Sequence, residues 1–168
     1  MNNKDLKVAV LGAGAMGCLF GGLLAEKGLN VTLIDVWKEH VEEINKNGLK
    51  MDGHGGDRFI KIPATSDPST IGKVDAVIVM CKATALEPAL KSIKNIIRDK
   101  TVFMSFQNGI GHEAIIKSIV GNEKVIGGTT TQASNILGPG HIMNHAALPS
   151  WIGDCLLYTS DAADDLLC

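Results

Sequence analysis

The feature that most constrains this chain is the segment Lys7–Gly17, which reads KVAVLGAGAMG. Val8–Leu11 is a short apolar run containing β-branched residues, which is typical of a buried strand. Beyond it the spacing of the apolar residues changes to three and four positions, which predicts a helix. The members of this helical stripe are Met16, Leu19, Phe20, Leu23 and Leu24. The glycine-rich turn Gly12–Gly17 therefore lies between a buried strand and a helix.

This turn has the spacing G-x-G-x-x-G, in which each glycine has a separate physical role. Gly12 allows the tight turn, Gly14 lets a pyrophosphate approach the backbone, and Gly17 lets the helix pack on the strand. The helix N-terminus offers free N–H groups and a partial positive charge to the phosphates. A second predicted strand, Asn30–Ile34, ends at Asp35, where the dinucleotide fingerprint has an acidic residue for the ribose. The agreement of strand, glycines, helix and acid favours dinucleotide binding over a packing role alone.

The rest of the chain alternates between predicted strands and helices. Further strands are predicted at Ala76–Met80, Thr101–Phe106 and Val125–Thr131. Helices are predicted over 37–47, along the stripe Leu86, Leu90, Ile93 and Ile97, and around Ile115–Ile119. The run Ala76–Met80 is apolar at every position, as in a parallel strand that is covered on both faces. This alternation predicts an α/β fold with a doubly wound, mainly parallel sheet of the Rossmann-like type.

Two segments interrupt this alternation. Leu49–Gly56 is polar and rich in glycine, which predicts a hairpin tip or surface loop, and a short strand is expected at Phe59–Ile62. Asn135–Gly153 is expected to form an antiparallel hairpin at the edge of the sheet. His141 and His145 have the spacing of a helical metal pair, but the Gly-Pro-Gly sequence before them argues against a helix, so no metal site is predicted.

Composition narrows the classes of function. The chain has 168 residues, enough for one domain with a hydrophobic core, and a net charge of −2, which gives no reason to expect nucleic acid or an anionic membrane as a partner. No apolar run is long enough to span a bilayer, and the N-terminus leads directly into the first strand, so a cytoplasmic protein is expected. The cysteines are scattered without a C-x-x-C motif, and Cys18 and Cys81 are expected to be small buried residues.

Polar side chains follow several of the predicted strands, at the edge of the sheet where such folds bind ligands. Lys82 follows an apolar strand and offers a cation to a carboxylate or carbonyl oxygen, although a solvent-facing lysine near a helix start fits the spacing equally well. Asn108, next to Gln107, either forms a turn before Gly109 or supplies an amide to a substrate. No nucleophile–base pair is evident.

Five motifs in order resemble the N-terminal half of the ketopantoate reductase family: GAGAMG, MCKATAL, SFQNGIGHE, GGTTTQA and GPGHIMNH…WIG. The resemblance runs from about Lys7 to Gly153. That family reduces 2-dehydropantoate to pantoate with NADPH in pantothenate synthesis. The resemblance implies that Lys82 lies near the nicotinamide and ribose, and that Asn108, with Gln107 in the same turn, contacts cofactor or substrate. It also implies a pyrophosphate site formed by Gly12, Ala13, Gly14, Ala15, Met16 and Gly17.

Asp35 departs from the pattern of this family. Its NADPH-selective members usually carry a basic residue after the second strand, whereas a carboxylate bonds a ribose hydroxyl and repels a 2′-phosphate. Lys38 lies nearby and offsets this repulsion in part. Asp35 therefore leaves a second function possible for this chain, that of an NAD-dependent D-2-hydroxyacid dehydrogenase of the same family. A nucleotide-binding fragment without catalysis is a third reading.

The resemblance also bears on domain organisation. We expect residues 1–154 to form a dinucleotide-binding domain, and the all-helical domain that follows in the family, with its catalytic lysine as general acid, has no counterpart here. Residues 155–168, CLLYTSDAADDLLC, do not resemble the family, and we interpret them as translated read-through of a sequencing adapter rather than as a divergent natural terminus. The chain is expected to bind a nicotinamide cofactor and a 2-oxo acid, and to be inactive by itself.

Overall fold

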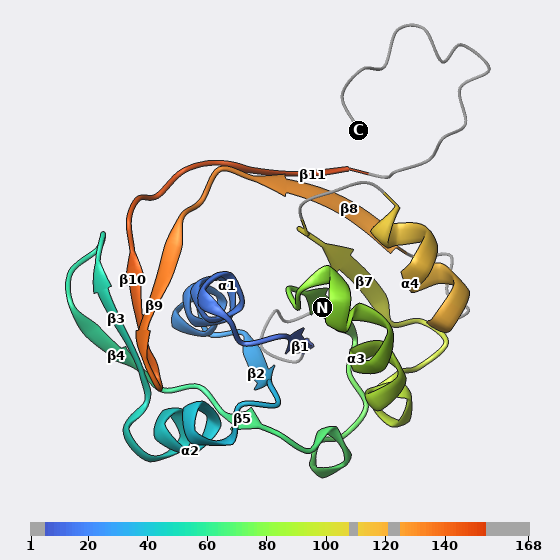
Figure 1. The fold of residues 1–168 in the computed structure, drawn as a ribbon, viewed down its shortest axis with the longest axis horizontal. Helices are drawn as coiled ribbons and strands as arrows, with labels where there is room; N and C mark the ends of the chain where they lie inside the picture. The colour runs from blue at the N-terminus through green and yellow to red at the C-terminus, as the bar shows by residue number, and fades with distance from the viewer. Residues whose placement is uncertain (1–5, 108–110, 121–124, 154–168) are drawn as a thin grey trace, which may run out of the picture.

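The computed structural model describes residues 6–107, 111–120 and 125–153, which form an α/β fold with two β-sheets (Figure 1). The larger sheet has seven strands in the order β11-β8-β7-β6-β1-β2-β5. These strands are β1 Lys7–Leu11, β2 Asn30–Ile34, β5 Ala64–Thr65, β6 Ala76–Val79, β7 Val102–Ser105, β8 Val125–Thr130 and β11 Ser150–Gly153. All neighbours are parallel except β8 and β11. The Rossmann-like, mainly parallel sheet predicted from the sequence is confirmed.

Helices cover both faces of this sheet. They are α1 Ala15–Glu26, α2 Lys38–Asn47, α3 Leu86–Ser92 and α4 His112–Val120, with short 3-10 turns at η2 Pro68–Thr70, η3 Ala83–Ala85 and η4 Lys94–Ile96. Alternate side chains of β1 enter two separate cores. Val8 and Val10 belong to the core that contains α1, whereas Ala9 and Leu11 belong to the core that contains α3 and α4. The side chains of β6 also enter the two cores alternately, so every residue of this strand is buried, as its unbroken apolar sequence predicts.

The helix predicted from the stripe Leu86, Leu90, Ile93 and Ile97 is interrupted, because α3 gives way to η4. The first three side chains are fully buried as expected. Ile96 is also fully buried, whereas Ile97 is only partly buried. A 3-10 turn has three residues per turn, so the next inward position comes one residue earlier than in an α-helix.

A smaller sheet of four strands, in the order β4-β3-β10-β9, lies beside α1 (Figure 1). Its strands are β3 Leu49–Gly53, β4 Arg58–Ile60, β9 Ser134–Gly138 and β10 His141–Asn144. Two glycines of α1 allow close packing on its two sides. A Cβ at Gly21 would lie 2.5 Å from Leu33 of β2, and a Cβ at Gly22 would lie 3.0 Å from Met51 of β3. The first helix therefore packs between the larger and the smaller sheet.

The smaller sheet corrects the prediction for Leu49–Gly56. This segment is not a surface loop throughout, because its first five residues form β3, with Leu49 and Met51 fully buried. Only the tip that begins at the exposed His54 is loop. Apolar and polar residues alternate along β3 with the period of a half-buried strand, and the glycines that follow conceal this short pattern.

The prediction of a single hairpin over Asn135–Gly153 is also wrong. β9 and β10 do form an antiparallel hairpin, but they belong to the smaller sheet because β10 pairs in parallel with β3. Only β11 reaches the edge of the larger sheet, antiparallel to β8. The strand expected at Phe59–Ile62 is present as β4, which begins one residue earlier and ends at Ile60. Pairing between segments so far apart in the chain leaves no local signal in the sequence.

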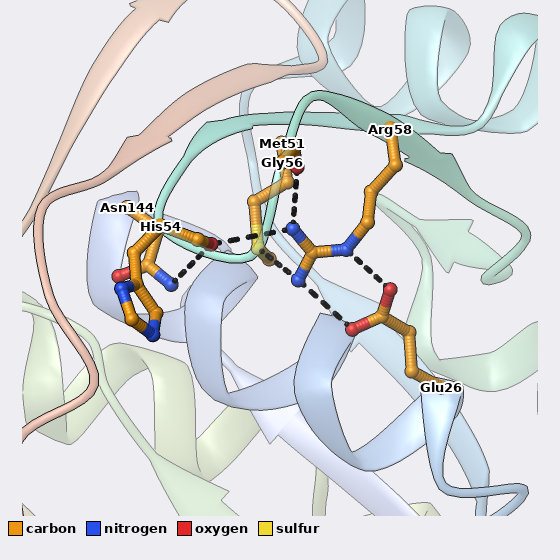
Figure 2. A network of polar contacts seen from close by, with 6 residues as sticks. All are labelled: Glu26, Met51, His54, Gly56, Arg58 and Asn144. Carbon is orange, nitrogen blue, oxygen red and sulfur yellow. Dashed lines mark hydrogen bonds and ion pairs between the residues drawn. The ribbon is translucent and has the colours of Figure 1, made fainter.

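Arg58 joins the tip of the β3–β4 hairpin to the end of α1 (Figure 2). Its Nε donates to Glu26 Oε1 at 2.5 Å and its second terminal nitrogen donates to Glu26 Oε2 at 3.0 Å. The other terminal nitrogen donates to the Gly56 carbonyl at 2.8 Å. The hydrogen bond from Arg58 holds the pKa of Glu26 below its usual range. Beside this pair, the His54 N–H donates to the Asn144 carbonyl at 2.8 Å, so the tip is fixed to β10 as well.

Candidate functional site

The glycine turn follows β1 directly, and its shape depends on Gly12. This residue has a φ of +98°, in the left-handed region that residues with a Cβ rarely adopt. Its N–H donates to the Ile34 carbonyl at 2.8 Å, which fixes the turn to the end of β2. A Cβ at this position would lie 2.5 Å from the backbone nitrogen of Cys81. Glycine therefore permits the chain to turn between β2 and the segment that follows β6.

Gly14 and Gly17 have opposite surroundings. A Cβ at Gly17 would lie 1.9 Å from the Gly12 carbonyl oxygen, so α1 packs directly on the turn. Gly14 precedes the helix, and apart from its chain neighbours no residue of the described chain lies within 4 Å of a Cβ built there. Ala15 and Met16 open α1, and the first N–H groups of an α-helix have no partner within it. Open space at a helix N-terminus with free N–H groups is the arrangement that binds a phosphate.

Asp35 follows β2, and both of its carboxylate oxygens accept hydrogen bonds from backbone N–H groups. Oδ2 accepts from Ala13 at 2.7 Å, and Oδ1 accepts from Trp37 at 3.0 Å. The half-buried carboxylate is thereby attached to the residue that precedes Gly14. Each oxygen of a carboxylate accepts more than one hydrogen bond, so Asp35 retains capacity for the hydroxyl groups of a ligand.

Lys82 and Gln107 lie at the carboxyl ends of β6 and β7, the two strands next to β1 on the side of the sheet away from β2. Lys82 is exposed and precedes η3. The side-chain amide of Gln107 donates to the carbonyl of Cys81, the residue that closely approaches Gly12. This bond connects the ends of β6 and β7. Asn108 lies outside the described residues, and all the other candidate residues gather at one edge of the larger sheet.

Two hollows of the described chain are lined by none of these residues. A hollow of about 400 Å³, lined in part by Glu43, Phe59 and His141, contains none of the candidate residues. Nε2 of His141 lies 2.6 Å from Oδ2 of Asp52, and this hydrogen bond holds the pKa of the Asp52 carboxyl below its usual range. In residues 6–107, 111–120 and 125–153, no group of His, Cys, Asp and Glu has the arrangement of a metal site. None of the helices described there is both long and apolar enough to cross a membrane.

His40 is a residue of this region that the motifs do not indicate. It is fully buried on α2, with its Nε2 3.3 Å from the Sγ of Cys18 in α1. Helical spacing places His40 on the same buried face as Ile44, and an imidazole at such a position is a signal that sequence alone can supply. Cys18 is fully buried as predicted, whereas Cys81 is only partly buried.

Comparison with known proteins identifies the family. Residues 8–155 match the family described as ketopantoate reductase PanE/ApbA. The chain belongs to this family. It is 36% identical over 137 residues to the 2-dehydropantoate 2-reductase of Lactococcus lactis subsp. lactis, a match that covers 80% of this chain and 44% of the relative. It is 42% identical over 135 residues to the enzyme of the same name from Pyrococcus horikoshii, covering 80% and 43%. The chain spans less than half the length of these two curated relatives.

Solved structures show the same fold. The crystal structure of 2-dehydropantoate 2-reductase from Geobacter metallireducens superposes with a TM-score of 0.82 at 31% identity, covering 90% of this chain and 50% of that one. A ternary structure of D-mandelate dehydrogenase with NADH and anilino(oxo)acetate gives a TM-score of 0.81 at 35% identity, covering 89% and 50%. The shared fold therefore includes relatives whose names give two different substrates.

Proposed function

We propose that this chain is the cofactor-binding part of a 2-dehydropantoate 2-reductase, an enzyme that reduces a 2-oxo acid to a 2-hydroxy acid with a nicotinamide dinucleotide. The observation that carries this proposal is the placement of Asp35 beside the open N-terminus of α1, through its bond to the Ala13 N–H. A dinucleotide needs a phosphate site and a ribose acceptor in this relation. Membership of the family and the names of its relatives support the class of reaction.

The described residues take distinct parts in binding. The N–H groups of Ala15–Gly17 bind the pyrophosphate, and Gly14 leaves the space that it enters. The oxygens of Asp35 accept the hydroxyl groups of the adenosine ribose. The bound nicotinamide supplies the hydride. Lys82 offers its ammonium group near the nicotinamide and the carbonyl to be reduced, and Asn108 offers an amide to cofactor or substrate.

Gln107 supports this arrangement from the end of β7. Its side-chain bond to the Cys81 carbonyl fixes the carboxyl end of β6, one residue before Lys82. The segment that carries the ammonium group is thereby held beside the glycine turn, because the backbone of Cys81 lies where a Cβ at Gly12 would stand.

We infer that NADH binds at least as tightly as NADPH. The two backbone N–H groups that bond Asp35 hold its carboxylate where the 2′-substituent of the ribose would lie. A hydroxyl group there donates to the carboxylate, whereas a 2′-phosphate meets a negative charge. Lys38 is exposed at the start of α2 and offsets this repulsion only in part.

Asp35 also favours a second candidate, an NAD-dependent D-2-hydroxyacid dehydrogenase. The likeness to D-mandelate dehydrogenase, which was solved with NADH, supports it. A fragment that binds a nucleotide without catalysis is a third candidate, since no residue here matches the lysine that the family uses as general acid. Loss of a general acid costs about 10²–10⁴ in rate, so we expect this chain to bind cofactor with little turnover.

Cofactor titration followed by turnover assays separates these candidates. Fluorescence titration gives the dissociation constants for NADH and NADPH, and both 2-dehydropantoate and 2-oxo-2-phenylacetate are then offered as substrates. Residual reduction that is selective for 2-dehydropantoate supports the first proposal, and selectivity for the aromatic oxo acid supports the second. Binding without any reduction supports the third, and a protein that binds neither cofactor contradicts all three.

A further inference from the structure

His40 connects three parts of the fold that are distant in sequence. Its ring stacks on Trp37, with centroids 4.9 Å apart and an interplanar angle of 12°. Its Nδ1 accepts a hydrogen bond from the N–H of Gly140, in the β9–β10 turn, at 2.9 Å. Its Nε2 lies 3.3 Å from Cys18 Sγ, and the same sulfur lies 3.1 Å from the carbonyl oxygen of Ala13. The contacts form a continuous line from the smaller sheet to the glycine turn.

The donors and acceptors along this line define where the protons lie. A backbone N–H only donates, so Nδ1 of His40 is the bare nitrogen and the neutral ring carries its proton on Nε2. Nε2 then donates to Cys18 Sγ, and the thiol proton is directed to the Ala13 carbonyl. Burial lowers the pKa of His40, and burial followed by the charge of Asp35 raises the pKa of Cys18 to about 12. Both groups are therefore neutral at pH 7, as this arrangement requires.

The carbonyl of Ala13 and the N–H of Gly14 belong to one planar trans peptide unit and point in opposite directions. Because Cys18 bonds that carbonyl on the buried side, the Gly14 N–H is directed away from the core. The neighbouring peptide unit is fixed as well, because the Ala13 N–H donates to Asp35 at 2.7 Å. On the other side, the carbonyl of Gly14 accepts from the backbone N–H of Cys18 at 2.8 Å. The bond from the Cys18 thiol orients the peptide between these two fixed units, and its loss loosens that peptide.

We propose that His40 is a positioning residue for the dinucleotide turn, which acts through Cys18 to direct the Gly14 N–H toward the pyrophosphate. This rests on the dinucleotide binding proposed above. Gly140 holds the imidazole in the tautomer that donates to Cys18, so the β9–β10 turn contributes to cofactor affinity from the smaller sheet.

Two amide substitutions at His40 separate positioning from packing. His40→Asn places an acceptor near Nδ1 and keeps the bond from Gly140, but it removes the donor to Cys18. His40→Gln places an amide near Nε2 and keeps that donor, but it removes the acceptor for Gly140. We expect the dissociation constant for NADH to rise about five- to tenfold in His40→Asn and to stay within about twofold in His40→Gln. Both variants lose one buried hydrogen bond, so their melting temperatures should fall by similar amounts.

Cys18→Ala provides a second route that leaves the imidazole in place. It should weaken NADH binding as much as His40→Asn does, and the double variant should weaken it no further, because both changes release the same peptide. His145 is exposed, so His145→Asn serves as the control and should leave affinity unchanged. If the losses of NADH affinity in the two single variants add in the double variant, His40 has only a packing role. The same conclusion holds if the NADH affinity of every variant falls in proportion to its melting temperature.

A measurement without ligand tests the proton arrangement itself. In ¹⁵N spectra of the imidazole ring, His40 should show a bare Nδ1 and a protonated Nε2. A ring protonated at Nδ1 would overturn the proposal whatever the affinities are. If the unmodified protein binds neither NADH nor NADPH, the proposed function fails together with this inference. If it binds NADH and His40→Asn binds equally well, this inference alone fails.

Discussion

Replacing Gly14 with valine separates the proposed phosphate site from the stability of the fold. Gly14 has a φ of −66°, which valine accepts, and apart from its chain neighbours no described residue lies within 4 Å of a Cβ built there. Valine reduces the conformational freedom of the unfolded chain, which stabilises the folded protein by about 0.4–1 kcal/mol. Valine is also a poorer N-cap residue than glycine, which destabilises the protein by about as much, so the two effects nearly cancel. We therefore expect the melting temperature to move by no more than about 4 °C.

The affinity of Gly14→Val for a dinucleotide should fall far more than its stability. The valine methyl groups extend into the space that the pyrophosphate enters, and a displaced phosphate loses hydrogen bonds to the N-terminus of α1. Hydrogen bonds to a charged group are worth about 1.5–3 kcal/mol each, so loss of two of them is about 3–6 kcal/mol. This corresponds to a dissociation constant at least about 100-fold higher. Fluorescence titration with NADH, beside thermal melting, measures both effects.

Gly72 offers a matched control for this substitution. Apart from its chain neighbours, no described residue lies within 4 Å of a Cβ built at Gly72. Its φ is outside the left-handed region, and it precedes β6 at the amino end of that strand. Gly72→Val should therefore change neither the affinity nor the melting temperature appreciably. A folded Gly14→Val protein that binds NADH as tightly as the unmodified chain would refute the placement of the pyrophosphate at this helix.

Three further changes test other parts of the site. Asp35→Ala should shift the ratio of NADPH to NADH affinity by about tenfold toward NADPH, which paired titrations measure, because it removes a repulsion of about 1.4 kcal/mol. Gly17→Ala should lower the free energy of unfolding by at least about 1–3 kcal/mol in urea titrations, because the new Cβ would lie 1.9 Å from the Gly12 carbonyl oxygen. The thiol of Cys18 has an unfolded pKa of 9.0 and a folded pKa raised to about 12, so the unfolded state ionises first and stability falls as pH rises from 9 toward 12. Between pH 8 and pH 10.5 the unmodified protein should lose about 2 kcal/mol more than Cys18→Ala in urea unfolding, and equal losses would contradict the burial of this thiol.

Elements of this fold can be predicted where the pattern that indicates them lies within one short segment of the sequence. The succession of β1, glycine turn and α1 is visible in the sequence because the apolar period changes from strand to helix between Val8 and Leu24. The buried strand β6 is equally visible as an unbroken apolar run. The strand β4 and the hairpin of β9 with β10 were expected, but their assembly into a separate sheet could not be predicted. That assembly depends on the pairing of β3 with β10, and neither segment shows which partner it pairs with.

The candidate site divides in the same way. Motif spacing and strand ends indicate the glycines, Asp35, Lys82 and Gln107, and the structure brings these to one edge of the sheet. Asn108 stays a prediction, because it lies outside the described residues. The line through His40 could not be predicted, since it needs the rotation of α2, the position of α1 and the β9–β10 turn together.

Titration of ¹⁵N-labelled protein with NADH tests the central claim most directly, because it reports both affinity and location. We predict saturable binding, with the largest amide shifts over Gly12–Gly17 and at Asp35, and smaller shifts at Gln107. Saturable binding with shifts confined to the hollow beside Glu43, Phe59 and His141 would contradict the assignment of the site. Absence of saturable binding by both NADH and NADPH would contradict dinucleotide binding itself.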